Sequence, residues 1–89
     1  MVTFDETKRQ SNISKHGIDL AECGGVFDAP MLTKEDTRES YGEQRLQSLG
    51  WLRGRVVFLV WPDRATGPHV ISCRYGDKHE THCYFQAVL

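Results

Sequence analysis

The chain has 89 residues and a formal net charge of −1, and 39% of its residues are hydrophobic. This length fits a small core, so we expect one domain over residues 1–89. The longest apolar run, Val56–Trp61, is far too short to span a bilayer, and we see no signal-peptide pattern. The three cysteines form no CxxC motif, so we expect reduced thiols and a cytoplasmic location.

The net charge hides an asymmetry between the two halves of the chain. Residues 1–45 contain six Lys or Arg and nine Asp or Glu, a balance of −3. Residues 46–89 contain five Lys or Arg and three Asp or Glu, a balance of +2, together with three of the four histidines. The second half could therefore face an anion, although so small an excess also fits an ordinary solvated surface.

Residues 6–16 predict a first helix that Asp5 or Thr3 caps and Gly17 ends. Ile13 is its only large apolar residue, so this helix contributes little to the core.

A polar stripe runs along one face of this helix at positions i, i+4, i+7 and i+8. The stripe consists of Lys8, Asn12, Lys15 and His16. One interpretation is a solvated face with basic residues near the helix C-terminus. The other is a helix edge that offers two lysines and an amide to phosphates.

The middle of the chain predicts a second helix and two strands. Asp19 and Glu22 have the spacing of a capping box, which opens the helix. Residues 31–33 are a candidate first strand and residues 44–52 a second one. The Arg53-Gly54 pair predicts a tight turn into the next strand.

The last third of the chain predicts the centre of the sheet. Val56–Trp61 needs cover on both faces and predicts a central strand. A short turn over residues 62–68 joins it to a strand at His69–Arg74, which favours antiparallel neighbours. A last helix opens at Asp77. We therefore predict an α+β fold with two N-terminal helices, an antiparallel sheet of three to four strands and a short C-terminal helix.

Several short motifs, spread over nearly the whole chain, occur in an order and at spacings that are together specific. They are Phe4-Asp5-Glu6 with Lys8; Asn12-x-x-Lys15-His16-Gly17-Ile18; Val26-Phe27-Asp28-x-Pro30; Tyr41-Gly42-Glu43-x-Arg45; Leu49-Gly50; and Ile71-Ser72-x-Arg74 followed by Glu80 and Tyr84. With these motifs the chain resembles the BrnT family of bacterial toxins.

This resemblance implies a RelE-like fold and a type II toxin–antitoxin system. Toxins of this family are small endoribonucleases that need neither metal nor cofactor and that halt translation. The resemblance further implies a ribbon-helix-helix (BrnA-like) antitoxin as the partner, with operator DNA bound only through the toxin–antitoxin complex.

The chain departs from the family pattern at two places. The stretch Tyr75–His82 is less basic than is usual after the Ile-Ser-x-Arg motif, and His69 stands where an arginine is common. The RNA-binding surface is therefore expected to be less cationic, because histidine is mostly neutral at pH 7. The alternative hypothesis is a BrnT-like protein that binds its antitoxin and regulates the operon without cleaving RNA.

Cleavage of RNA without a metal needs a base for the ribose 2′-hydroxyl, an acid for the leaving oxygen and cations for the charged transition state. Arg74 is the best candidate for the cation, since a guanidinium grips two phosphate oxygens and stays charged. Its structural alternative is an ion pair with Glu80 or Asp77. Glu80 is a candidate base, although its spacing from Asp77 also predicts a capping box.

The last helix offers further candidates for proton transfer. His79 fits because an imidazole titrates near neutral pH, and Tyr84 could donate a proton, stack on a base or dock the helix on the sheet. His79 and Cys83 are four residues apart, but too few ligands stand nearby for us to predict a metal site.

The remaining candidates would bind RNA rather than react with it. The family resemblance gives weight to the polar stripe of Lys8, Asn12, Lys15 and His16. Because we expect these polar positions to have no role in the core, we predict RNA or antitoxin contacts there. His69 ranks lower, because its odd spacing from Arg74 along one strand places the two side chains on opposite faces.

Overall fold

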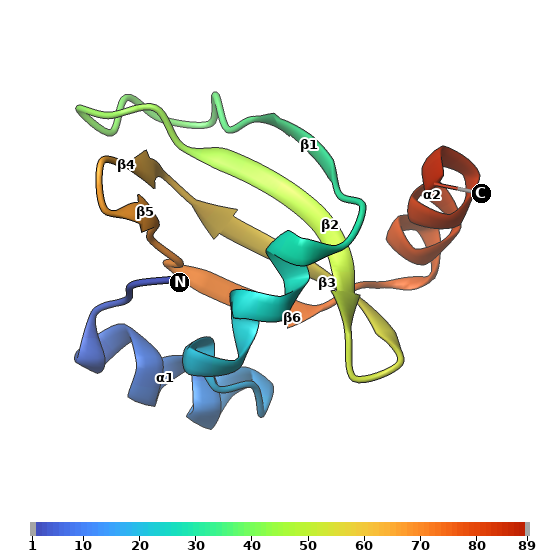
Figure 1. Cartoon of the computed structure of the whole chain (residues 1–89), viewed down its shortest axis with the longest axis horizontal. Helices are drawn as coiled ribbons and strands as arrows, with labels where there is room; N and C mark the ends of the chain where they lie inside the picture. Colours follow the sequence, from blue (N-terminus) through green and yellow to red (C-terminus); the bar gives the residue numbers. More distant parts are fainter. Residues whose placement is uncertain (1, 89) are drawn as a thin grey trace.

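A computed structural model describes residues 2–88 and shows an α+β fold (Figure 1). Its elements are α1 (Glu6–His16), the 3-10 helix η1 (Leu20–Asp28), β1 (Leu32–Glu35), β2 (Leu46–Leu52), β3 (Arg55–Trp61), β4 (Asp63–Arg64), β5 (Gly67–Pro68), β6 (Ser72–Tyr75) and α2 (Lys78–Val88). Four strands form an antiparallel sheet in the order β1-β2-β3-β6, and β4 pairs with β5. No helix within residues 2–88 has the length and hydrophobicity that crossing a membrane requires.

Helix α1 has the ends that the sequence predicts. The carboxylate of Asp5 accepts hydrogen bonds from the backbone N–H groups of Thr7 and Lys8, which caps the N-terminus. Gly17 follows the last turn with a φ of 71°, a left-handed conformation that favours glycine.

The second predicted helix is a 3-10 helix rather than an α-helix. Asp19 caps it by accepting a hydrogen bond from the N–H of Ala21. Glu22 does not complete a capping box, because its carboxylate pairs with Arg53 instead. The Gly24-Gly25 pair gives little support to a regular α-helix, and the sequence thus locates this segment but not its helix type.

The sheet is built around β3 as predicted, with a tight turn from β2. Arg53 and Gly54 both have positive φ values, 54° and 75°, as a two-residue hairpin turn requires. The predicted strand over residues 69–74 is shorter in the structure, where β6 begins only at Ser72. The turn over residues 62–68 contains the short β4–β5 pair.

The two faces of the sheet have different covers. Alternate residues of β3, among them Val57 and Leu59, point into a core that they share with η1 residues such as Leu20 and Val26. Helix α2 packs on the opposite face, where Tyr84 stacks against Trp51 with ring centroids 6.5 Å apart. In Figure 1, α1 lies below the sheet and α2 beyond its right-hand end. Part of the α2 face therefore stays open.

Helix α2 begins with the predicted capping box. The N–H of Glu80 donates to the Asp77 carboxylate at 2.8 Å, and the N–H of Asp77 donates to the Glu80 carboxylate at 2.9 Å. The cap fixes the first turn of α2 directly after β6, so Arg74 and the start of the helix lie close together.

Candidate functional site

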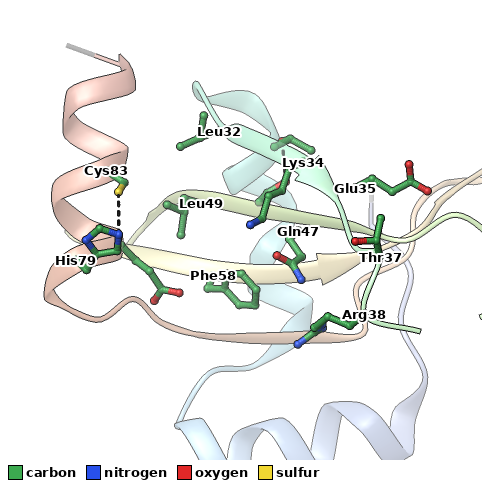
Figure 2. Close-up of a pocket in the computed structure, with 13 residues that line it drawn as sticks. Leu32, Lys34, Glu35, Thr37, Arg38, Gln47, Leu49, Phe58, His79 and Cys83 are labelled. Carbon is green, nitrogen blue, oxygen red and sulfur yellow. Dashed lines mark hydrogen bonds between the residues drawn. The ribbon is translucent and has the colours of Figure 1, made fainter. Parts of the chain in front are cut away.

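A groove of about 750 Å³ occupies the open part of the α2 face (Figure 2). Its floor is a row of apolar side chains that the strand register places side by side: Leu32 of β1 opposite Leu49 of β2, and Leu49 opposite Phe58 of β3. The first turns of α2 close one end of the groove, and the segment after β1 forms its rim. Such a concave, partly apolar surface with polar groups at its edges is a candidate binding site.

Arg74 lies next to this floor. It is the register partner of Phe58, and its guanidinium carbon lies 4.4 Å from the centre of the Phe58 ring. Its Nη1 and Nη2 donate to the two carboxylate oxygens of Glu80 at 2.8 and 2.9 Å. The side chain is 38% exposed, and within residues 2–88 its Nε makes no hydrogen bond. The guanidinium is thus held in one orientation with donors left for a ligand.

Glu80 is suited to orienting Arg74 rather than to accepting a proton. The hydrogen bond from Arg74 lowers the pKa of the Glu80 carboxyl, and the N–H of Asp77 adds to the effect. A carboxylate that is already stabilised in its charged form is a weak base. The structure therefore contains the ion pair that the sequence offered as the structural alternative, and the two partners form one unit.

His79 stands one residue before Glu80, on the α2 wall of the groove (Figure 2). Its Nε2 lies 3.6 Å from the Sγ of Cys83, which also lines the groove. His79 is exposed, so its imidazole is accessible to a ligand that occupies the groove. Among the predicted candidates, His79 and Glu80 thus line one end of the groove. Arg74 is not a lining residue, but it contacts two residues that are, Glu80 and Phe58.

The sequence analysis missed a second arginine at this groove. Arg38 follows β1 and lines the rim, where Figure 2 shows its side chain reaching toward the groove. Its Nε and Nη2 donate to the carboxylate of Asp36 at 2.8 and 2.7 Å. Asp36 is 3% exposed, which is rare for a carboxylate. Arg38 lies between the two strands predicted at residues 31–33 and 44–52, and nothing in the residue pattern there sets it apart from its charged neighbours.

Lys34 and Gln47 were missed as well. They are register partners on β1 and β2, and both line the groove (Figure 2). A correct register for β1 would have found them, since Lys34 is two residues from Leu32 and Gln47 two from Leu49, which places both on the floor's face.

Asn12 has a structural role that the sequence analysis did not foresee. It is 4% exposed, and its Nδ2 donates to the backbone carbonyls of Ile18 and Cys73, both at 2.8 Å. Its Oδ1 accepts a hydrogen bond from the N–H of Cys73 at 3.0 Å. The expectation that this position has no role in the core was wrong, because the amide links α1 to β6.

The other stripe residues, Lys8, Lys15 and His16, are exposed on α1 and do not line the groove. Helix α1 packs against β6 and η1, away from the face that α2 covers. His69 also lies outside the groove, in the segment before β6, and its Nδ1 is 2.8 Å from the hydroxyl of Thr3. Partial burial lowers the pKa of His69.

Tyr84 is only 4% exposed and does not line the groove. Its hydroxyl donates to the backbone carbonyl of Pro30 at 2.9 Å, and its ring packs against Trp51. These contacts give Tyr84 the helix-docking role that the sequence left open beside proton transfer. Within the part of the chain that the structure describes, no three His, Cys, Asp or Glu side chains gather as a metal site would require.

Comparisons with known proteins agree with this architecture. The family model of the ribonuclease toxin BrnT of type II toxin–antitoxin systems matches residues 4–80. The 1.1 Å crystal structure of the Brucella abortus ribonuclease toxin BrnT is similar, with a TM-score of 0.66 and 28% sequence identity, over 86% of this chain and 96% of that chain. Curated proteins gave no match.

Proposed function

The chain belongs to the BrnT family of ribonuclease toxins of type II toxin–antitoxin systems, and from this membership we propose that it cleaves RNA in the groove beside Arg74. Membership implies an RNA target and an antitoxin partner, and it does not favour the alternative of a module that only binds. The observation that carries the location of the site is the Arg74–Glu80 pair, which holds a guanidinium at the groove with donors left over.

Arg74 would stabilise the charge that develops on the scissile phosphate. A guanidinium held in place before the reaction needs no reorientation in the transition state, which is the main advantage of a fixed electrostatic group. Glu80 supplies this orientation from α2, and Phe58 supports the guanidinium from below. Lys34 adds a further positive charge at the groove.

His79 is the group that we assign to proton transfer. The 2′-oxygen attacks the phosphorus and gives its proton to a base, while the bond to the 5′-oxygen breaks and that oxygen takes a proton from an acid. An imidazole can serve on either side of this exchange at neutral pH. His79 is exposed on the wall of the groove that also carries Glu80, the partner of Arg74. We propose that the reaction needs no metal.

We further propose that the antitoxin is a ribbon-helix-helix protein and that the chain reaches operator DNA only through it, in the cytoplasm. An acidic or apolar segment of the antitoxin would cover the Arg74 face, because the groove combines an apolar floor with exposed cationic donors. Bound there, it would compete directly with RNA.

The test is cleavage of a labelled RNA by purified protein in the presence of EDTA. We expect R74A to lower the cleavage rate by about 10² or more, as loss of one preorganised donor does in other enzymes. H79N should lower it by about 10² through loss of proton transfer. E80Q should have a smaller effect, because Arg74 remains charged but is less well oriented.

The matched control is R64Q. Arg64 also pairs with a carboxylate, that of Glu43 at 3.0 Å, but it lies outside the groove. If R64Q and R74A lose the same activity, the groove is not the site. If wild-type protein leaves RNA intact, the proposal of cleavage fails and the binding-only alternative takes its place.

A further inference from the structure

We propose that Arg38 is a second phosphate-binding residue of the groove and that the buried carboxylate of Asp36 is its positioning residue. This inference rests on the proposed function, since it assigns to the RNA a second anchoring point beside the scissile phosphate. It concerns residues that the motif analysis did not single out.

Arg38 has the geometry of a prepared anion ligand. Its contact with Asp36 uses Nε and one hydrogen of Nη2, at 2.8 and 2.7 Å. Nη1 makes no hydrogen bond within residues 2–88, and 60% of the side chain is exposed. The guanidinium therefore has one edge fixed by the protein and another open to solvent at the groove rim. Two N–H groups of a guanidinium fit two oxygens of a phosphate.

The support beneath Arg38 differs from that of a surface ion pair. The Asp36 side chain is fully buried, and besides Arg38 it accepts a hydrogen bond from the hydroxyl of Tyr41 at 3.2 Å. Its backbone N–H donates to the carbonyl of Arg45 at 2.8 Å, which joins the two ends of the loop. By contrast, both partners of the Arg64–Glu43 pair are substantially exposed, at 44% and 33%.

Burial of a carboxylate is costly unless it is paired, and Arg38 and Tyr41 supply the hydrogen bonds that the Asp36 carboxylate needs. Here the anion is buried and the cation faces the groove. The Arg38 guanidinium also holds the pKa of the Asp36 carboxyl well below its usual range, so the pair stays ionised wherever the protein is folded near neutral pH.

Arg38 and Arg74 are both close to the groove. Arg38 lines its rim, and Arg74 contacts Phe58 of its floor and Glu80 of its α2 wall. The pKa of Arg74 is raised by its hydrogen bond with Glu80, and the charge of Arg38 opposes this rise. Two like-charged guanidiniums repel each other, and an anion bound between or across them reduces that repulsion. An RNA backbone, with one negative charge at each phosphate, supplies such anions at regular spacing.

The experiment measures binding separately from cleavage. A fluorescent 2′-O-methyl RNA oligonucleotide has no free 2′-hydroxyl and stays intact, so its affinity can be followed by anisotropy from low to high salt. The proteins are wild type, R38Q, R38K, D36N, the double variant D36N/R38Q and the control R64Q. Circular dichroism and the thermal midpoint establish that each variant is folded.

We expect R38Q to lower affinity about tenfold at low salt and to reduce the slope of log K against log[salt] by about 0.7, the value for one lost phosphate contact on a single strand. R38K should keep most of the slope but lose affinity, because an ammonium keeps the positive charge but cannot donate two parallel N–H groups to two phosphate oxygens. R64Q should leave both quantities unchanged.

D36N tests the positioning role. If Asp36 acts through Arg38, D36N weakens binding in the wild-type background but adds nothing to R38Q. If Asp36 only stabilises the loop, D36N lowers the thermal midpoint and weakens R38Q further, which would overturn that role. Should D36N fail to fold, R38Q and R38K still decide whether Arg38 binds phosphate.

The outcomes separate this inference from the proposed function. Equal affinity and salt slope in wild type and R38Q would overturn the inference, even if wild type cleaves RNA through Arg74. Loss of affinity in R38Q supports the inference, even if wild type binds RNA without cleaving it, a result that would refute the proposed function alone.

Discussion

Asn12 provides the sharpest test of the difference between a polar surface stripe and a buried polar link. Its side-chain amide donates to two backbone carbonyls and accepts from one N–H, all of them buried. Cys73 contributes both its N–H and its carbonyl, so the Asn12 amide pairs with the outer edge of β6 much as a neighbouring strand would. The perturbation is Asn12→Ala, which removes these three contacts and leaves their backbone partners without the amide.

The size of the effect follows from those three hydrogen bonds. Each contributes roughly 1 kcal/mol net, and a buried group left without a partner costs about 1–3 kcal/mol. We therefore expect N12A to lower the free energy of unfolding by about 3–5 kcal/mol. The total free energy of unfolding of an 89-residue chain is roughly 4–13 kcal/mol, so this loss is a large fraction of the total stability.

The assay is urea denaturation at pH 7 followed by circular dichroism. With an m-value of about 1–1.5 kcal/mol/M for a chain of this size, N12A should lower the midpoint by roughly 2–5 M. Asn12→Asp has nearly the same shape but no donors, and it faces two carbonyl oxygens. It should be at least as destabilising as N12A, which would show that the donors matter.

Lys15→Ala is the control on the same helix. Lys15 is exposed, so its loss should change stability by no more than about 0.5 kcal/mol. A stability of N12A within about 1 kcal/mol of wild type would refute the reasoning about the buried link. If N12A were as stable as wild type but bound RNA less well, the result would support the original prediction that Asn12 contacts RNA.

Three further changes test separate parts of the fold. Tyr84→Phe removes one hydrogen bond and should cost about 1 kcal/mol in urea denaturation while leaving the RNA cleavage rate unchanged, which a proton-donor role would not allow. Hydrogen bonds from Arg9 lower the pKa of Asp19 from its ordinary 3.8 to about 2. The ionised Asp19 carboxylate therefore stabilises the fold fully above pH 3.8, and this stabilisation is lost as the pH falls through about 2. Asp19→Asn should therefore lower the thermal midpoint at pH 7 and lower it much less at pH 2, close to the pKa of Asp19 in the folded protein. Gly50→Ala places a methyl group against the side chain of Val26 and should destabilise the fold by about 1–3 kcal/mol in the same urea assay.

Features that depend on neighbours in the sequence were predicted well. Asp5 and Gly17 mark the two ends of α1, Arg53 and Gly54 form the turn, and Asp77 caps α2 together with its partner three residues later. Each of these is decided by contacts within one turn of the backbone, so residue type and spacing suffice.

The candidate site was predicted only where a motif pointed to it. The family resemblance pointed to Arg74 and Glu80, and capping-box spacing also pointed to Glu80. The structure adds that Arg74 donates two hydrogen bonds to the Glu80 carboxylate. Arg38 and Asp36 carried no such signal, because a charged loop contains many equivalent residues until burial selects one carboxylate among them.

The sequence by itself determined the ends of α1, the start of α2 and the hairpin turn, because short-range hydrogen bonds fix them. It determined the α+β class through its apolar pattern and short connections. The tertiary structure decided which face of each element meets another. It buried Asn12 although helical spacing placed it with exposed lysines. It also placed Arg38 on the rim of the groove and Arg74 against Glu80, a residue of the groove's α2 wall, although the two arginines are distant in the chain. Periodicity records which residues share a face, whereas burial and partners depend on what that face packs against.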